Sequence, residues 1–230
     1  MSILGVIPAR GGSKGILKKN IVRLGNKPLI AYTIKEAIKS NLSRVIVTTD
    51  SNEIAKISTD NGAEVPFKRP IELAQDKSNS IDVAIHSIKE MEKLDNTSYN
   101  GVMYLQPTSP FRSSEDINIA LELLEKNEKA CSVISVVNVQ GHHPARMKYI
   151  NNGYLIDPDF SEKKENQNRQ ELTPMYIRNG AIYLTRKEIL LKRSFKGEFS
   201  LAYEMPLNRS VNIDCQEDLE FANWILSKKL

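Results

Sequence analysis

The chain has 230 residues, of which 40% are hydrophobic, and its formal charge is +4. This length suits a single domain over residues 1–230 with a sizeable core. The mild and dispersed positive charge, with no stretch that alternates arginine and aromatic side chains, argues against nucleic-acid binding and makes a small polyanion the better partner.

The sequence also bears on where in the cell the protein is expected. No apolar run approaches the roughly 20 residues that cross a membrane, and the first residues lack the charged and apolar regions of a secretory signal. Cys131 and Cys215 stand far apart without a C-x-x-C motif, so we expect reduced thiols rather than a disulfide or a zinc site. We therefore expect a cytoplasmic protein with no membrane partner.

A glycine-rich, basic loop follows the first expected strand. Residues 3–7 are apolar and indicate a buried strand, and residues 9–15 then read Ala-Arg-Gly-Gly-Ser-Lys-Gly. Glycine tolerates positive φ and has no Cβ, so the backbone N–H groups of such a loop can close around an anion. The spacing is neither that of the Walker loop nor that of the dinucleotide fingerprint. Taken alone, the loop fits a triphosphate site and a solvated basic surface equally well; its cations are Arg10, Lys14, Lys18 and Lys19.

Helical and extended patterns alternate after this loop. Apolar residues recur at helical spacing over residues 29–40, and residues 44–49 form a β-branched strand. Ser51 can cap a second helix, which an Asn-Gly pair ends, and residues 64–66 form a short strand. This β-α-β-α-β order predicts a doubly wound, mostly parallel, Rossmann-like α/β sheet, in which ligands bind at the carboxyl ends of the strands.

Residues 67–80 have no clear period and lead into a helix expected over residues 81–94, with Ser80 as its cap. Arg69, together with the hydroxyl groups of Ser78 and Ser80, suits a ribose and the edge of a base. The segment alone fits an ordinary surface loop better.

The strand expected over residues 101–105 ends in a restricted loop. Two prolines hold Gln106 and Thr108 at the carboxyl end of this strand, and a glutamine offers both a donor and an acceptor. A helix comes next, capped by Ser113 or Ser114. Its expected buried stripe is Ile117, Ala120, Leu121 and Leu124.

The character of the chain changes after the strand expected over residues 130–139. Residues 140–176 are polar and have little periodicity, and a loop of this length in a compact domain usually serves a function or an interface. His142 and His143 lie side by side in this excursion. Adjacent side chains of an extended segment point to opposite faces, so we do not expect these two to share a metal ion.

The last third returns to the sheet. An Asn-Gly pair at 179–180 signals a turn before a strand that includes Tyr183, a short helix is expected over residues 186–192, and residues 210–214 are expected to close the sheet before the last helix. On that closing strand Asn212 and Asp214 would point to the same side, where oxygen ligands two residues apart can share Mg²⁺. Asp218 is better explained as an acid in the first turn of the last helix.

Several motifs together resemble those of the CMP-sugar synthetases, the acylneuraminate cytidylyltransferases that activate sialic acids and related nine-carbon sugar acids. They are the loop at 9–15 followed by Lys19-Asn20, Arg-Pro-x-x-Leu-Ala-x-Asp at 69–76, Leu-Gln-Pro-Thr-Ser-Pro at 105–110, and Asn-Gly-Ala-Ile-Tyr at 179–183. The resemblance covers most of the chain. It implies an enzyme that joins CTP and a 2-keto sugar acid into a CMP-sugar and releases pyrophosphate. The related Kdo synthetases carry an acidic residue near the end of the 101–105 strand, and its absence favours the sialic-acid branch.

The resemblance also implies roles for individual residues. The residues implied to bind the nucleotide are Ala9, Arg10, Gly12, Ser13, Lys14, Asn20, Arg69, Ser78 and Ser80, and those implied to be catalytic are Arg10, Lys14, Lys19 and Asp214. The sugar acid is implied to contact Gln106, Arg146, Arg169, Asn179 and Tyr183. For Tyr183, packing in the core is the alternative. The metal ion would be held by Asp214 and Asn212, although the family pattern has an aspartate where this chain has Asn212.

A homodimer is the last implication of the resemblance. In the family, a His-His-Pro-x-Lys/Arg segment, here residues 142–146, belongs to a dimerisation excursion, and its basic residue enters the site of the partner. Residues 140–176 would be that excursion, with Arg146 as the basic residue and Phe195 or Phe199 as an aromatic contact across the dimer. N-acetylneuraminate, legionaminate, pseudaminate and Kdo remain open as substrates. Because of Asn212, a nucleotide-binding module without catalysis also remains open.

Overall fold

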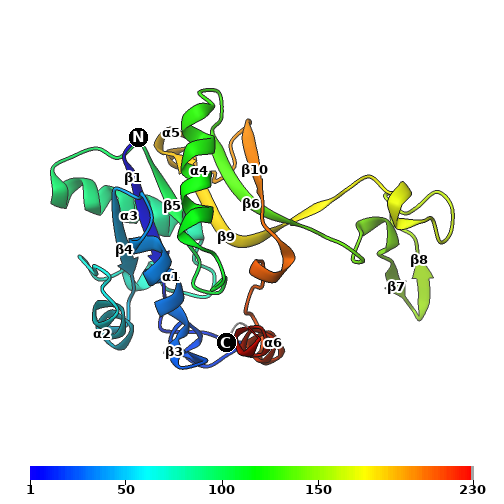
Figure 1. Cartoon of the computed structure of the whole chain (residues 1–230), viewed down its shortest axis with the longest axis horizontal. Helices are drawn as coiled ribbons and strands as arrows, with labels where there is room; N and C mark the ends of the chain where they lie inside the picture. Colours follow the sequence, from blue (N-terminus) through cyan, green and yellow to red (C-terminus); the bar gives the residue numbers. More distant parts are fainter. Residues whose placement is uncertain (229–230) are drawn as a thin grey trace.

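The computed structural model describes residues 1–228, which are built around one six-stranded sheet (Figure 1). The strand order is β10-β6-β9-β5-β1-β4. Neighbouring strands are parallel except at β9, which runs antiparallel to β5 and β6. The bounds are β1 Ile3–Pro8, β4 Arg44–Thr48, β5 Gly101–Tyr104, β6 Ser132–Asn138, β9 Tyr176–Arg186 and β10 Ser200–Glu204.

Helices cover both faces of this sheet. Because successive strand residues point to opposite faces, Ile3 and Ile7 pack in the apolar cluster of α1, α2 and α4, whereas Leu4 and Val6 pack in that of α3 and α5. This arrangement confirms the predicted doubly wound, mostly parallel fold. The helices are α1 Leu29–Ile38, α2 Asn52–Asp60, α3 Ser80–Asp95, α4 Ser114–Lys126, α5 Lys187–Leu191 and α6 Gln216–Ser227.

A third apolar cluster lies beside the sheet, where α6 packs against the small hairpin of β2, Arg23–Leu24, and β3, Lys27–Pro28. Leu219 and Ala222 of α6 are buried there together with Ile213, which precedes the helix. Short 3₁₀ helices connect the larger elements: η1 Lys19–Ile21, η2 Ile71–Leu73, η3 Pro144–Arg146, η4 Arg169–Glu171 and η5 Leu207–Arg209.

Several expected boundaries are wrong. Residues 64–66 contribute only one isolated bridge, between Glu64 and Ile46, and the next bridge along this edge joins Lys68 to Thr49, so the pairing is too interrupted to form a strand. The cap of α3 is Asn79, whose side chain accepts a hydrogen bond from the N–H of Ile81 at 3.0 Å, so Ser80 is the first residue of the helix. At α4 the cap is Ser113, one of the two expected candidates.

Two differences affect the strands near the candidate site. The strand at the edge beside β6 is β10. Residues 210–214 form no strand, because within residues 1–228 their only backbone bond toward the sheet joins the N–H of Ile213 to the carbonyl of Thr108 at 2.8 Å. The Asn-Gly pair at 179–180 is not a turn before a strand but lies inside β9. Gly180 has a φ of +77° there, and the pairing with β6 shifts register between Ile134 and Val136.

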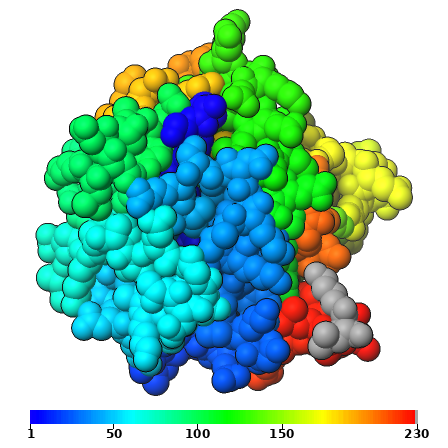
Figure 2. Space-filling model, turned by 60° about the vertical axis from the view of Figure 1, so that its left-hand side comes forward, coloured from blue at the N-terminus to red at the C-terminus, as the bar shows by residue number. Residues whose placement is uncertain are grey.

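Residues 140–176, here called the arm, project from the sheet at the junction of β6 and β9 (Figure 1). The arm contains a small hairpin of β7, Tyr149–Asn151, and β8, Tyr154–Ile156, and it stands out from the rounded body in the space-filling view (Figure 2). Both ring nitrogens of His143 are used within the arm, by the carbonyl of Thr173 and the N–H of Ala145. Within residues 1–228, no helix has the length and apolar character needed to cross a membrane.

Candidate active site

A cavity of about 580 Å³ opens at the carboxyl ends of β1 and β5. Strand β1 has β4 on one side and β5 on the other, so strand order reverses here, the usual place for a ligand in such sheets. The cavity gathers side chains from segments far apart in the sequence. The predicted site residues that line it are Arg10, Gly12, Ser13, Lys14, Lys19, Asn20, Arg69, Ser78, Ser80, Gln106, Asn212 and Asp214.

The glycine-rich loop follows β1 and forms one wall of the cavity. Gly11, Gly12 and Gly15 do not use the positive φ that glycine tolerates, whereas Lys18 does have a positive φ, of +52°. What Gly15 provides is space, because a Cβ built on it would lie 2.4 Å from the carbonyl oxygen of Asp214. The amide of Asn20 donates to the carbonyl of Arg10 at 3.0 Å and ties the two ends of the loop together.

Not every residue of this segment faces the cavity. Ala9 is fully buried, and its N–H donates to the carbonyl of Thr48 at 3.0 Å, so it belongs to the floor beneath the cavity. Lys18 turns away and pairs with Glu53 at 2.7 Å. The cations that line the cavity from this segment are therefore Arg10, Lys14 and Lys19.

Carboxylates neutralise all three of these cations. Asp76 bridges two of them, with Nη1 of Arg10 at 2.9 Å and Nζ of Lys14 at 2.7 Å, and these partners, Lys14 foremost, lower the pKa of Asp76. Nζ of Lys19 lies 2.9 Å from Oδ1 of Asp214. Sequence reasoning assigned no role to Asp76, although it is the last residue of the motif at 69–76.

Arg69 forms the inner wall of the cavity and is 5% exposed. Its Nη2 donates to the carbonyl of Thr48 at 2.5 Å. Burial lowers the pKa of its guanidinium, and the nearby Tyr104 and Asp50 partly oppose this lowering. The hydroxyl of Ser78 accepts from the N–H of Gln75 and donates to the carbonyl of Glu72, so it closes the loop that carries Asp76.

Four of the five residues predicted to contact the sugar lie outside this cavity. Asn179 is buried under it, where its amide donates to the hydroxyl of Ser210 at 3.0 Å, and Tyr183 packs against Phe195 at a ring distance of 5.5 Å. Arg146 and Arg169 lie in the arm, away from the cavity of their own chain. Only Gln106 lines the cavity.

Asn212 and Asp214 lie side by side, although they are not on a strand. The amide nitrogen of Asn212 donates to Oδ2 of Asp214, and Oδ1 of Asn212 is buried and has no hydrogen-bond partner among residues 1–228. No three His, Cys, Asp or Glu side chains within residues 1–228 form a metal-holding group. The carboxylate of Asp214 fits Mg²⁺ when phosphate oxygens and water supply the remaining ligands. Asn212 would add its amide oxygen only after its side chain turns over, because its nitrogen faces Asp214 and its oxygen lies near Gly180.

The first turn of α6 fixes the end of this segment. Oδ2 of Asp218 accepts hydrogen bonds from the N–H groups of Asp214 at 2.9 Å and Cys215 at 3.0 Å. Asp218 is thus occupied at the start of its helix, as its expected role in the first turn requires.

Comparison with known proteins agrees with this geometry. The chain is 38% identical to an N-acylneuraminate cytidylyltransferase of Escherichia coli, over 99% of this chain and 52% of that protein. It is 35% identical to a CMP-N,N'-diacetyllegionaminic acid synthase of Legionella pneumophila, over 100% of this chain and 96% of that protein. The chain thus spans about half the length of the first relative and nearly all of the second.

A solved structure of CMP:2-keto-3-deoxy-manno-octonic acid synthetase complexed with CTP superposes with a TM-score of 0.75 over 100% of both chains. Its sequence is only 16% identical, so this likeness concerns the fold. The family model described as cytidylyltransferase matches residues 4–225. On this match over nearly the whole chain, the protein belongs to the cytidylyltransferase family.

Proposed function

We propose that this protein transfers CMP from CTP to the anomeric hydroxyl group of a nine-carbon 2-keto sugar acid and releases pyrophosphate. The observation that carries the proposal is the gathering of Arg10, Lys14 and Lys19 around the cavity at the carboxyl end of β1. The relatives support the choice of substrates, since they are named for acylneuraminate and diacetyllegionaminic acid. CTP and two unpaired cysteines fit the cytoplasm as the place of reaction.

The reaction needs positioned charge rather than a covalent intermediate. The anomeric oxygen forms a bond to the α-phosphorus, the bond to the bridging oxygen breaks, and pyrophosphate leaves with that electron pair while the hydroxyl proton is released. Arg10, Lys14 and the backbone of the loop would hold the phosphates. Lys19 would neutralise the charge that grows on the leaving group. The nucleoside would lie against Arg69, with Ser78 and Ser80 beside it.

Mg²⁺ is part of this proposal, with Asp214 and Asn212 as its protein ligands. When bound, the ion would draw charge from the phosphate oxygens. The ammonium of Lys19 and the amide of Asn212 both contact the carboxylate of Asp214, so they fix the direction in which its oxygens point. Since the protein supplies one carboxylate here, metal affinity would depend strongly on the bound triphosphate.

The sugar acid would be held by two chains of a homodimer. The arm carries Arg146, and its hairpin exposes Ile150 and Leu155, which are 78% and 74% exposed and would be covered by a partner. Arg146 of one chain would then reach the cavity of the other, where Gln106 is available. Of the two aromatic candidates for a contact across the dimer, Phe199 is exposed, whereas Phe195 packs in the core of its own chain.

Pyrophosphate release tests the proposal. Each of CTP, ATP, GTP and UTP is combined with N-acetylneuraminate, legionaminate, pseudaminate and Kdo. We expect release with CTP and at least one nine-carbon acid, and a decrease in turnover on the order of 10²-fold in Arg10→Ala and in Lys14→Ala. Release with Kdo alone would move the substrate to an eight-carbon acid. No release with any pair would leave a nucleotide-binding module without catalysis.

A further inference from the structure

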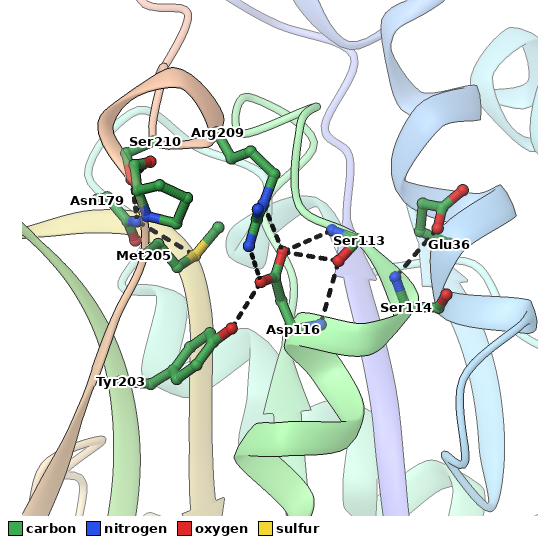
Figure 3. A network of polar contacts seen from close by, with 10 residues as sticks. Glu36, Ser113, Ser114, Asp116, Asn179, Tyr203, Met205, Arg209 and Ser210 are labelled. Atoms are coloured by element: carbon green, nitrogen blue, oxygen red, sulfur yellow. Dashed lines mark hydrogen bonds and ion pairs between the residues drawn. The ribbon is translucent and has the colours of Figure 1, made fainter.

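A buried carboxylate on α4 lies outside the cavity and has no role in the proposed chemistry. Asp116 is 1% exposed, and its two oxygens accept hydrogen bonds from the backbone and hydroxyl of Ser113, from the hydroxyl of Tyr203 at 2.6 Å and from Nη2 of Arg209 at 2.6 Å (Figure 3). The cap of α4 needs only the bonds to Ser113. The other two bonds run to the edge strand β10 and to the segment after it.

That segment leads directly into the cavity. Arg209 ends η5, and five residues later the chain reaches Asp214. In the part of the chain that the structure describes, no strand pairs with residues 210–214. They are connected to the body by the hydrogen bonds of Ser210 with Asn179, at 3.0 Å, and of Ile213 with Thr108, at 2.8 Å, and by the buried side chain of Ile213. At the end of the segment, Asp214 also pairs with Lys19 and donates its N–H to Asp218, both at 2.9 Å. The ion pair of Arg209 with Asp116 is the contact that fixes this segment at its start, before Ser210 and Ile213 make their own contacts.

Small shifts of this segment matter because the fit at its end is tight. The carbonyl of Asp214 lies so close to Gly15 that a Cβ there would approach it to 2.4 Å. The carboxylate of the same residue meets Lys19 at 2.9 Å. A displacement of about 1 Å between reacting groups can lower a rate by about 10²-fold.

We propose that Asp116 is a positioning residue, which, through Arg209, holds residues 205–214 so that Asn212 and Asp214 stand opposite the glycine-rich loop. The inference rests on the proposed function for its effect on catalysis, but not for its effect on the segment itself. The alternative is that Asp116 only stabilises the start of α4. Removing Arg209 while the cap stays intact separates the two roles, because only a positioning role would then be lost.

Arg209→Met makes that separation. The side chain of Arg209 is 34% exposed, and its removal leaves Asp116 bonded to Ser113 and Tyr203, so the fold should survive. Lys187→Met is the matched control, because Lys187 is 30% exposed and pairs with the half-buried Glu92 at 2.7 Å, on the face of the sheet covered by α3 and α5. Arg209→Lys, which keeps the positive charge, should retain part of the activity and exchange protection that Arg209→Met loses.

Two measurements decide the matter. In hydrogen exchange of the ligand-free protein, we follow the hydrogen-bonded amides of Ser210, Ile213, Asp214 and Cys215. We expect them to exchange at least tenfold faster in Arg209→Met and at the parental rate in Lys187→Met. In pyrophosphate release, we expect Arg209→Met to lower kcat about tenfold and to raise the Mg²⁺ concentration for half-maximal rate, with the KM for CTP changed less than twofold.

Exchange and Mg²⁺ dependence that stay parental in Arg209→Met, or that change equally in Lys187→Met, would overturn the positioning role. An inactive parental protein would instead overturn the proposed function, and hydrogen exchange would still test the anchor. Changed exchange with unchanged kinetics would reduce Asp116 to a structural residue and also count against the proposal.

Discussion

Replacing Gly15 by alanine tests how closely the glycine-rich loop meets the segment of Asp214. The new Cβ would lie 2.4 Å from the carbonyl oxygen of Asp214, whereas ordinary contact begins near 3.4 Å, so loop and segment must separate by about 1 Å. The backbone angle of Gly15 itself is one that alanine adopts. The effect therefore arises from crowding and not from backbone strain.

The expected size depends on this separation. Overpacking of a close contact costs about 1–3 kcal/mol, and each kcal/mol lowers the Tm of a chain of this length by about 2–4 °C. Because the loop carries Lys14 and the segment carries Asp214, a shift of about 1 Å between them should lower kcat/KM by about 10²-fold. Gly15→Ala should thus lose both stability and activity.

Two other glycines provide controls. A Cβ on Gly12 or on Gly141 meets no atom of the described residues within 4 Å. Gly141→Ala, in the arm, should keep both the parental Tm and the parental activity. Gly12→Ala should keep the parental Tm. If this variant loses activity, the added methyl group must obstruct a phosphate that lies against the loop. Thermal unfolding and CTP-dependent pyrophosphate release measure the three variants. A Gly15→Ala protein with parental Tm and turnover would refute the contact.

The other predictions concern charge. If Arg146 acts in the site of the partner, a mixture of Arg146→Ala and Lys14→Ala chains should, after subunit exchange, be more active than either variant alone. If activity does not recover, Arg146 acts in its own chain or outside the site. Asp214→Asn should nearly abolish activity at any practical Mg²⁺ concentration, whereas Asn212→Asp should lower the Mg²⁺ needed for half-maximal rate; a titration of the two beside the parent checks both, and unchanged Mg²⁺ dependence in Asp214→Asn would contradict the metal site. Burial opposes ionisation of Asp116, but hydrogen bonds, from Arg209 foremost, outweigh it and hold the pKa of Asp116 below its usual range. Its ion pair should therefore stabilise the fold above about pH 4 and lose this effect as the pH falls further, so Asp116→Asn should flatten the acid side of a Tm–pH profile.

The first half of the fold could be predicted because its signals are local. An apolar run, a cap and a helical period each depend on a few neighbouring residues, and they placed β1, α1, β4 and α2. The strand β10 was not predicted, because an extended sequence pattern does not indicate which strand it pairs with. Residues 210–214 alternate between polar and apolar and residues 200–204 do not, but the latter pair with β6, whereas Ile213 bonds to Thr108.

The residues of the site divide in the same way. The glycine-rich loop and Gln106 were found from residue type next to a strand end. Asp76 and Asp116 were not, since a carboxylate acquires its meaning from partners distant in the sequence: Arg10 is 66 positions from Asp76, and Arg209 is 93 from Asp116. Glycine indicated the right location, but residue type alone does not separate a need for positive φ from a need for space, and the structure uses only the second at Gly15.

The pairing of cations and carboxylates in the ligand-free cavity bears on how a triphosphate would enter it. Arg10 and Lys14 are bridged by one carboxylate, that of Asp76, which lies between them where a phosphate held by both cations would lie. Since Lys14 is 80% and Asp76 46% exposed, water and salt screen this pair, and its rupture opposes binding only weakly. A phosphate offers more acceptor oxygens and more charge to the same donors, so it would displace the carboxylate. In the ligand-free protein, Asp76 would thereby keep both cations extended over the cavity without blocking the entry of CTP. Because the cations act on the phosphates by charge, the affinity for CTP should fall steeply with ionic strength.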